Sequence, residues 1–252
     1  MTDKTPVTHY SKAPITEAII DIQFAGPECD PTALLKLQDK EGSSYPEKKP
    51  ILIASFMLDA GQADAPPAVT TQSQSQHGWA FVTADKLQIW QVRSGAFTFS
   101  RLAPYQNWTA FRNEARRLWE LSKPYFKPEQ ITRIAVRYVN RLELPVPLRD
   151  FKDYLQTVPE VSPKLPQGLL SYFMQLQIPQ EDIQSLLILN QQFVSNKPEA
   201  TSVPVILDLD LFRTYELPQE EEPLWSLFER LHEKKNDIFQ ACITDLTREL
   251  IR

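Results

Sequence analysis

The order of amphipathic segments constrains the fold of this 252-residue chain more than any other feature. Two stretches have helical periodicity: residues 107–123, closed by two prolines, and residues from 223 toward the C-terminus. Between them, segments alternate or run apolar as strands do. The expected strands are 15–24, 51–58, 78–92, 96–102, 131–144, 171–178, 185–194 and 203–212, with short helices at 31–38 and 149–158 and exposed loops at 61–71 and 196–202.

The same order of elements occurs twice. Each half begins with a strand and a short helix, continues with three or four antiparallel strands, and ends in a long amphipathic helix. This order predicts an α+β fold of two pseudo-repeats, residues 1–127 and 128–252, that form one compact unit. A unit of this kind resembles the TATA-binding-protein-like and helix-grip folds, in which a curved sheet wraps a long helix. We expect the first strands of the two halves to be neighbours.

Four phrases carry a resemblance to a known family: "HYSKAPITEAIIDIQF", "RIAVRYVNRLELP", "LDLDLF" and "LHEKKNDIFQACITDLTRELI". They resemble a sporadically distributed, uncharacterised bacterial protein family of about this length. Its opening motif is Tyr-x-x-x-Pro-Ile-x-Glu-Ala, and its central motif is Arg-Tyr-x-Asn-Arg. The resemblance implies no particular reaction, and the sporadic distribution implies an accessory or defence-associated role.

Charge and composition limit the location and the partners. The net charge is −5 and the sequence pI is about 5.4, so bulk charge does not draw the chain to nucleic acid or to an anionic membrane. The start is polar, no apolar stretch reaches membrane-spanning length, and two cysteines make no disulfide framework. These features predict a cytoplasmic protein without a membrane partner. Six glycines against 21 prolines disfavour glycine-rich phosphate loops.

Three arginines at four-residue intervals, Arg133, Arg137 and Arg141, share one face of the strand 131–144. A nucleic-acid track, an anion site and an internal salt-bridge ladder are all compatible with this spacing. Glu17 and Asp21 have the same spacing in the first strand. Matching the two halves sets Glu17 against Arg133 and Asp21 against Arg137, which predicts structural ion pairs. Arg141 has no matched acid and is the candidate contact for an external anion or partner.

Charge is segregated along the chain. Residues 101–152 hold eleven Lys and Arg against five Asp and Glu, and residues 207–222 hold six acids against Arg213. The basic helix adds Arg112, Arg116 and Arg117 to the candidate anion or partner contacts. The same segregation is also compatible with complementarity inside the fold or between subunits.

Motifs that carry catalytic chemistry are missing from the sequence. It has no Walker-type loop, no GxGxxG and no Cys/His cluster with metal-ligand spacing, and His9, His77 and His232 stand far apart. No catalytic, cofactor-binding or metal residue is therefore predicted. Asp208 and Asp210 alternate with leucines and share one strand face. They are a metal or acid–base pair, the solvated face of a half-buried strand, or partners for the arginines.

Aromatic residues between 79 and 105 leave three possibilities open: a platform for stacking bases, a ligand cavity, or hydrophobic core. The residues are Trp79, Phe81, Trp90, Phe97, Phe99 and Tyr105. Their mixed parity favours core, because a platform needs one face. The sequence thus predicts a non-enzymatic binding or regulatory protein with a protein partner or a homodimer. The alternatives are a small ligand in a helix-grip cavity and nucleic acid bound through residues 101–152.

Overall fold

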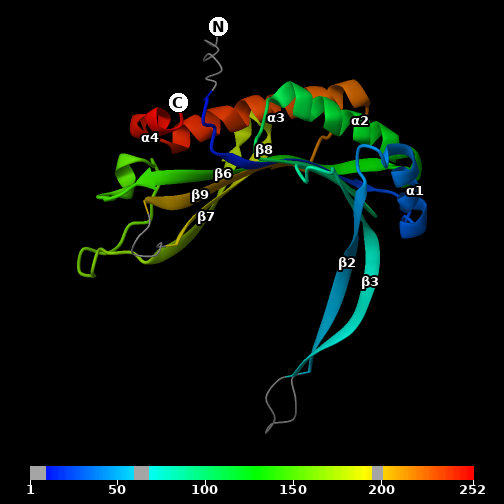
Figure 1. Ribbon diagram of the computed structural model, residues 1–252, viewed down its shortest axis with the longest axis horizontal. Coiled ribbons are helices and arrows are strands. Elements are labelled where there is room, and N and C mark those ends of the chain that lie inside the picture. Colours follow the sequence, from blue (N-terminus) through cyan, green and yellow to red (C-terminus); the bar gives the residue numbers. More distant parts are fainter. Residues whose placement is uncertain (1–9, 60–67, 195–200) are drawn as a thin grey trace. The chain divides into compact units, whose positions relative to one another are not determined.

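The computed structural model describes residues 10–59, 68–194 and 201–252 (Figure 1). These residues form nine strands and four α-helices, which confirms the α+β class. The strands belong to one open antiparallel sheet with the order β2-β3-β4-β5-β1-β6-β9-β8-β7. β1 (Ile15–Ala25) and β6 (Gln130–Pro145) are neighbours in this order, so the predicted adjacency of the two first strands is confirmed.

The chain divides into two compact units, and neither is continuous in sequence. The N-terminal unit contains Asp21–Ser100 and Trp108–Thr132. The C-terminal unit contains Arg101–Asn107, Arg133–Arg252 and the described residues up to Ile20. The predicted pseudo-repeats, residues 1–127 and 128–252, concern the order of elements and stay a prediction.

The N-terminal unit has an aromatic core under two helices. Its elements are the end of β1, α1 (Pro31–Glu41), β2 (Glu47–Asp59), β3 (Ala68–Val82), β4 (Gln88–Arg93), most of β5 (Ala96–Leu102) and α2 (Trp108–Phe126). The ring of Phe24 lies 5.7 Å from Trp119 and 5.0 Å from Phe126, and Phe97 packs edge-on against Trp119. The amphipathic pattern predicted for α2 therefore places its apolar face in this core.

The C-terminal unit combines β6 to β9 and the first part of β1 in one sheet, with a long helix along one face. Its main elements are β6, β7 (Ser171–Gln180), β8 (Ser185–Val194), β9 (Ser202–Arg213), α3 (Glu221–Cys242) and α4 (Asp245–Leu250). Figure 1 shows α3 lying along one side of these strands. The buried leucines of β9, at positions 207, 209 and 211, lie on the face that α3 covers. Burial of each such side chain contributes about 1.5–3 kcal/mol relative to exposure.

Several predicted helix limits were wrong. α2 runs through Pro124 to Phe126, because a proline in the last turn removes one hydrogen bond without ending the helix. α3 starts at Glu221 and stops at Cys242, so the last helix does not run unbroken toward the C-terminus. Ile243 is extended and forms an isolated antiparallel bridge with Leu155, after which Thr244 caps α4. The predicted helix 149–158 does not form. Leu155, inside that range, takes part in the bridge to Ile243, and the only helical element there is a 3₁₀ turn at 151–153.

Some predicted strands and loops also differ. The segment 51–58 was expected to be buried, yet Leu52 and Ile53 of β2 are exposed. The segment 78–92 is the end of β3 and β4 up to Val92, joined by a turn. Residues 68–71 belong to β3, Thr201 is an exposed bend and Ser202 begins β9, while the rest of the two predicted loops lies outside the described residues. No helix in the described part of the chain has both the length and the apolarity needed to cross a membrane.

Candidate functional site

One face of the C-terminal unit's sheet carries charged and amide side chains in register. We call this the polar face. It is the side of β6, β9, β8 and β7 that carries Arg137, Asp208, Asn190 and Gln175, and it lies opposite the side that α3 covers. Strand pairing aligns Val139, Asp208, Asn190 and Gln175 in one row across all four strands. The neighbouring row is Arg137, Asp210, Ile188 and Gln177. Because side chains alternate along each strand, these two rows lie next to each other on the same face.

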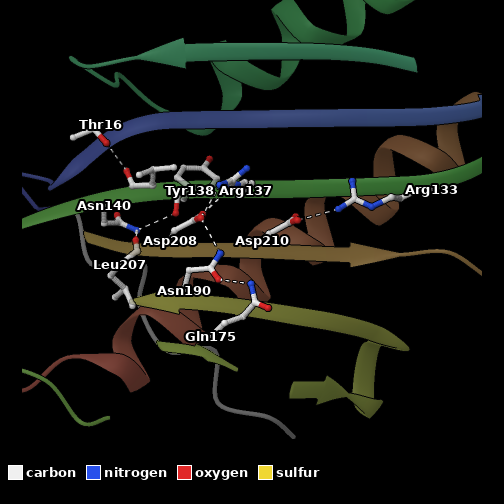
Figure 2. Close-up of polar contacts among 11 residues, drawn as sticks. Thr16, Arg133, Arg137, Tyr138, Asn140, Gln175, Asn190, Leu207, Asp208 and Asp210 are labelled. Atoms are coloured by element: carbon white, nitrogen blue, oxygen red, sulfur yellow. Dashed lines mark hydrogen bonds and ion pairs between the residues drawn. The ribbon is translucent and has the colours of Figure 1, made fainter. Parts of the chain in front are cut away.

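Arg137 and Asp208 form the strongest ion pair of the polar face (Figure 2). Arg137 Nε and Nη2 donate to the two carboxylate oxygens of Asp208 at 2.8 and 2.7 Å. This two-point geometry fixes the planes of both groups. The hydrogen bonds to Asp208 hold the pKa of Arg137 above its ordinary value, and the charges of Asp210 and Glu17 act in the same direction. Arg137 is therefore a fully charged, oriented group of the sheet.

Amide side chains extend this pair to the edge of the sheet. Asn190 Nδ2 donates to Asp208 Oδ2 at 3.1 Å, and Asn190 Oδ1 accepts a hydrogen bond from Gln175 Nε2 at 2.8 Å. Figure 2 shows the resulting path from β6 through β9 and β8 to β7. The path compensates the nearly buried Asp208 carboxylate with two donors from different strands.

The other two arginines of the polar face also have carboxylate partners. Arg133 Nη2 lies 3.0 Å from Asp210 Oδ2, and its guanidinium stacks 4.5 Å above the ring of Phe212. Arg141 Nε donates to Glu143 at 2.6 Å in an exposed pair. A hydrogen bond from Ser202 and the Arg141 charge hold the pKa of Glu143 below its usual value. The interpretation of Asp208 and Asp210 as partners for the arginines is confirmed.

The predicted acids of β1 have other contacts. Asp21 accepts a hydrogen bond from Thr98 at 2.8 Å and lies 3.8 Å from Arg93, all within the N-terminal unit. Glu17 contributes only its charge to Arg137, after Asp208 and Asp210. The bidentate partner of Arg137 is thus Asp208 and not the Asp21 that matching the two halves assigned to it. The assignment failed because it did not consider β9, the other neighbour of β6.

The three predicted basic contacts of α2 differ in exposure: Arg117 is exposed, and Arg112 and Arg116 are half-buried. Arg117 bridges two acids, with Nη1 2.6 Å from Glu41 and Nε 2.9 Å from Glu114. Arg112 is half-buried and donates to the Asn113 side chain at 2.8 Å, and Arg116 is also half-buried. Arg117 therefore ties α1 to α2 within the N-terminal unit.

Most of the aromatic residues between 79 and 105 belong to the hydrophobic core, as their mixed parity predicted. Phe81, Trp90, Phe97 and Phe99 are buried, which confirms the core interpretation for these four. Tyr105 is half-buried and belongs to a polar cluster described below. Among the residues that the structure describes, no three His, Cys, Asp or Glu side chains form a group that could hold a metal ion.

A buried polar cluster in the C-terminal unit was missed by sequence reasoning. Tyr138 of β6 is fully buried, and its hydroxyl lies 2.8 Å from the Tyr105 hydroxyl and 3.5 Å from His232 Nδ1. Lys235 of α3 is 5% exposed, and its Nζ lies 3.6 Å from the centroid of the Tyr138 ring. The sequence signal was the i, i+3 spacing of His232 and Lys235 on the helix side that faces β6.

Hydrogen-bond donors fix the protonation of this cluster. Lys235 Nζ donates to Asn236 Oδ1 at 2.6 Å, so the amide nitrogen of Asn236 points to His232 Nε2 at 3.2 Å. Nε2 must then accept, which leaves the proton on Nδ1. Burial and the Lys235 charge lower the pKa of His232 to about 3, and burial lowers the pKa of Lys235 to about 7. The cluster holds a neutral histidine beside a lysine whose charge is costly.

Comparison with known proteins adds no assignment to this site. No protein-family model matches the sequence, and no curated protein matches it significantly.

Proposed function

We propose that this protein is a non-enzymatic binding or regulatory component, and that the polar face contacts a protein partner. The observation that carries the proposal is the distribution of charge on that face. Arg133, Arg137 and Arg141 are each paired with a carboxylate of the same sheet, whereas the side chains exposed toward β7 are uncharged. The exposed uncharged residues are Phe173, Gln175, Gln177 and Gln192.

Such a surface has the composition of a protein interface. Interface cores are depleted in charged residues and enriched in aromatic ones. Phe173 is 65% exposed, so it can bury a large area on contact with a partner. The glutamines offer donors and acceptors to a polypeptide backbone.

The charges count against nucleic acid as the partner. A phosphate track needs basic groups whose counterions are released on binding. On the polar face the carboxylates Asp208, Asp210 and Glu143 already accompany the arginines. The chain as a whole carries a net charge of −5. An anionic polymer would have to compete with these acids.

Capture from extracts of the native host tests the proposal. We expect the immobilised wild-type protein to retain a specific protein, and Phe173→Ser to lose it. Leu250→Ser is the matched control, because Leu250 is also an exposed apolar residue of the C-terminal unit but lies on α4. Retention of the same protein by Phe173→Ser would contradict the proposal. So would tight binding of oligonucleotides with a steep salt dependence.

We further infer a finer description of the fold and of the biological setting. Each unit combines antiparallel strands with a long helix, which supports two pseudo-repeats of the TATA-binding-protein-like or helix-grip type. Membership of the sporadic bacterial family, an accessory or defence-associated role and a cytoplasmic location are parts of the same proposal. They rest on the sequence phrases and on the composition given above.

A further inference from the structure

The outer edge of β7 differs from the other edge of the sheet. β7 ends the strand order, and its ten residues pair with β8 without a register shift. Its sequence, SYFMQLQIPQ, contains no charged residue. In the described part of the chain, the backbone hydrogen bonds of β7 are those to β8. An unbroken, uncharged edge strand of this length is a template for pairing with another strand.

β2, at the opposite end of the order, has the usual protection against such pairing. It begins with Glu47, Lys48, Lys49 and Pro50, and its pairing with β3 shifts register twice. Charges, proline and bulges are the features by which natural proteins block edge pairing. β7 has only Pro179, near its end. The chain therefore protects one edge and leaves the other open.

We propose that β7 pairs antiparallel with β7 of a second copy of this chain, about a two-fold axis. The proposed contact uses the strand edge and a second copy, so it goes beyond the proposed function of the polar face. About such an axis, each residue of β7 lies opposite a residue of the same parity in the other copy. The reason is that the two sheets join edge to edge, with equivalent faces on the same side.

The side chains of β7 suit this symmetry in every such register. The even-numbered residues Tyr172, Met174, Leu176 and Ile178 are aromatic or aliphatic, and Gln180 at the end of the strand is uncharged, so no register sets like charges opposite each other on this face. The odd-numbered residues are also uncharged, so they cause no repulsion between the two copies. They are Ser171, Phe173, Gln175, Gln177 and Pro179. Cross-strand pairs of aromatic and aliphatic side chains stabilise such a ladder.

The charged residues nearest to β7 in the sequence have opposite signs at its two ends. Glu181 follows β7 directly, and Lys164 is seven residues before its first residue. Antiparallel pairing brings the Glu181 end of one copy toward the Lys164 end of the other. A single strand pair buries less than a standard interface, so we expect dissociation constants on the order of micromolar.

Sedimentation velocity over a range of about 1–200 µM tests the pairing. The wild-type chain should form a dimer with rising concentration. Gln175→Lys should weaken the dimer at least tenfold, because it sets lysines near each other at the centre of the paired strands. The matched control Gln192→Lys makes the same substitution at an exposed site of β8, one strand inward, and should leave the dimer intact.

Cysteine cross-linking identifies the register. Phe173→Cys, Gln175→Cys and Gln177→Cys place single thiols on the polar face, while the native Cys29 and Cys242 are buried. The variant nearest the two-fold axis should form an intermolecular disulfide on oxidation. A chain that stays monomeric at all concentrations would overturn the proposal, as would a dimer that Gln175→Lys does not weaken. Pairing of β7 with a strand of a different protein, and not with itself, would also overturn it while leaving the polar-face function to its own test.

Discussion

Arg137 and Asp208 share two hydrogen bonds but differ in their access to water: the arginine side chain is 44% exposed and the aspartate side chain 8%. When one member of an ion pair is removed, the energetic cost depends on how well water can solvate the group that remains. The guanidinium of Arg137 can be solvated in place. The carboxylate of Asp208 cannot, so the two halves of this pair are not equivalent.

Arg137→Ala should therefore destabilise the protein more than Asp208→Asn does. We expect losses of about 1–3 kcal/mol and about 1 kcal/mol, since the exposed arginine limits the strength of the pair. Urea denaturation of both variants measures the difference. Arg141→Ala is the control, because its pair with Glu143 is exposed on both sides and should contribute less than about 0.5 kcal/mol. Equal losses for Arg137→Ala and Asp208→Asn would contradict the asymmetry.

Lys235→Met should stabilise the protein by about 1–3 kcal/mol at pH 7, because the amine is buried and, in the described part of the chain, contacts the Asn236 amide and the Tyr138 ring and no carboxylate. Burial lowers the pKa of Lys235 to about 7 in the folded state, below its unfolded value. The destabilising contribution is thus complete below pH 7 and fades as pH rises toward the unfolded pKa of about 10.4.

The free-energy difference between Lys235→Met and wild type should accordingly shrink between pH 7 and pH 10. Denaturation at several pH values in this window measures it. Lys234→Met is the matched control, since Lys234 pairs with Asp182 at the surface of the same helix. A constant advantage of Lys235→Met across the window would show that packing, and not charge, is responsible.

Tyr45→Phe should destabilise the N-terminal unit by about 1–2 kcal/mol. The Tyr45 side chain is buried, and its hydroxyl contacts Gln88 at 2.7 Å and Glu114 at 2.9 Å. Removal of the hydroxyl leaves these two groups without that contact. Thermal melting measures the loss, and Tyr215→Phe at an exposed tyrosine should change the melting temperature little. Equal melting temperatures for Tyr45→Phe and wild type would exclude a structural role for this hydroxyl.

Thr244→Ala should cost about 1–2 kcal/mol, because this side chain joins two segments. Its hydroxyl donates to the backbone oxygen of Asp153 at 2.6 Å and caps α4 through the Thr247 amide. Thr244→Ser keeps the hydroxyl and should restore most of the stability. Failure of the serine variant to recover stability would assign the effect to the lost methyl group.

The sequence predicted those features that depend on local periodicity. The alternation around Arg133 and Arg137 was enough to assign their strand, and the apolar stripe that includes Trp119 was enough to assign a helix. The partner of Arg137 depends on which strand lies on each side of β6, and no local pattern encodes that order. Likewise, the end of α3 depends on Leu155, a residue far away in sequence that pairs with Ile243. The burial of Lys235 could not be predicted from the sequence, because a lysine on an amphipathic helix is normally solvated.

The interleaving of the two units has a consequence for how such a protein can arise and be made. The chain passes from one unit to the other at four points, after residues 20, 100, 107 and 132. No single crossover in a gene could therefore transfer either unit intact to another protein. During synthesis, β1 leaves the ribosome early, while β9 and α3 of its unit are still to be translated. A message truncated before Ser202 would yield neither β9 nor α3, so the C-terminal unit could not form from it.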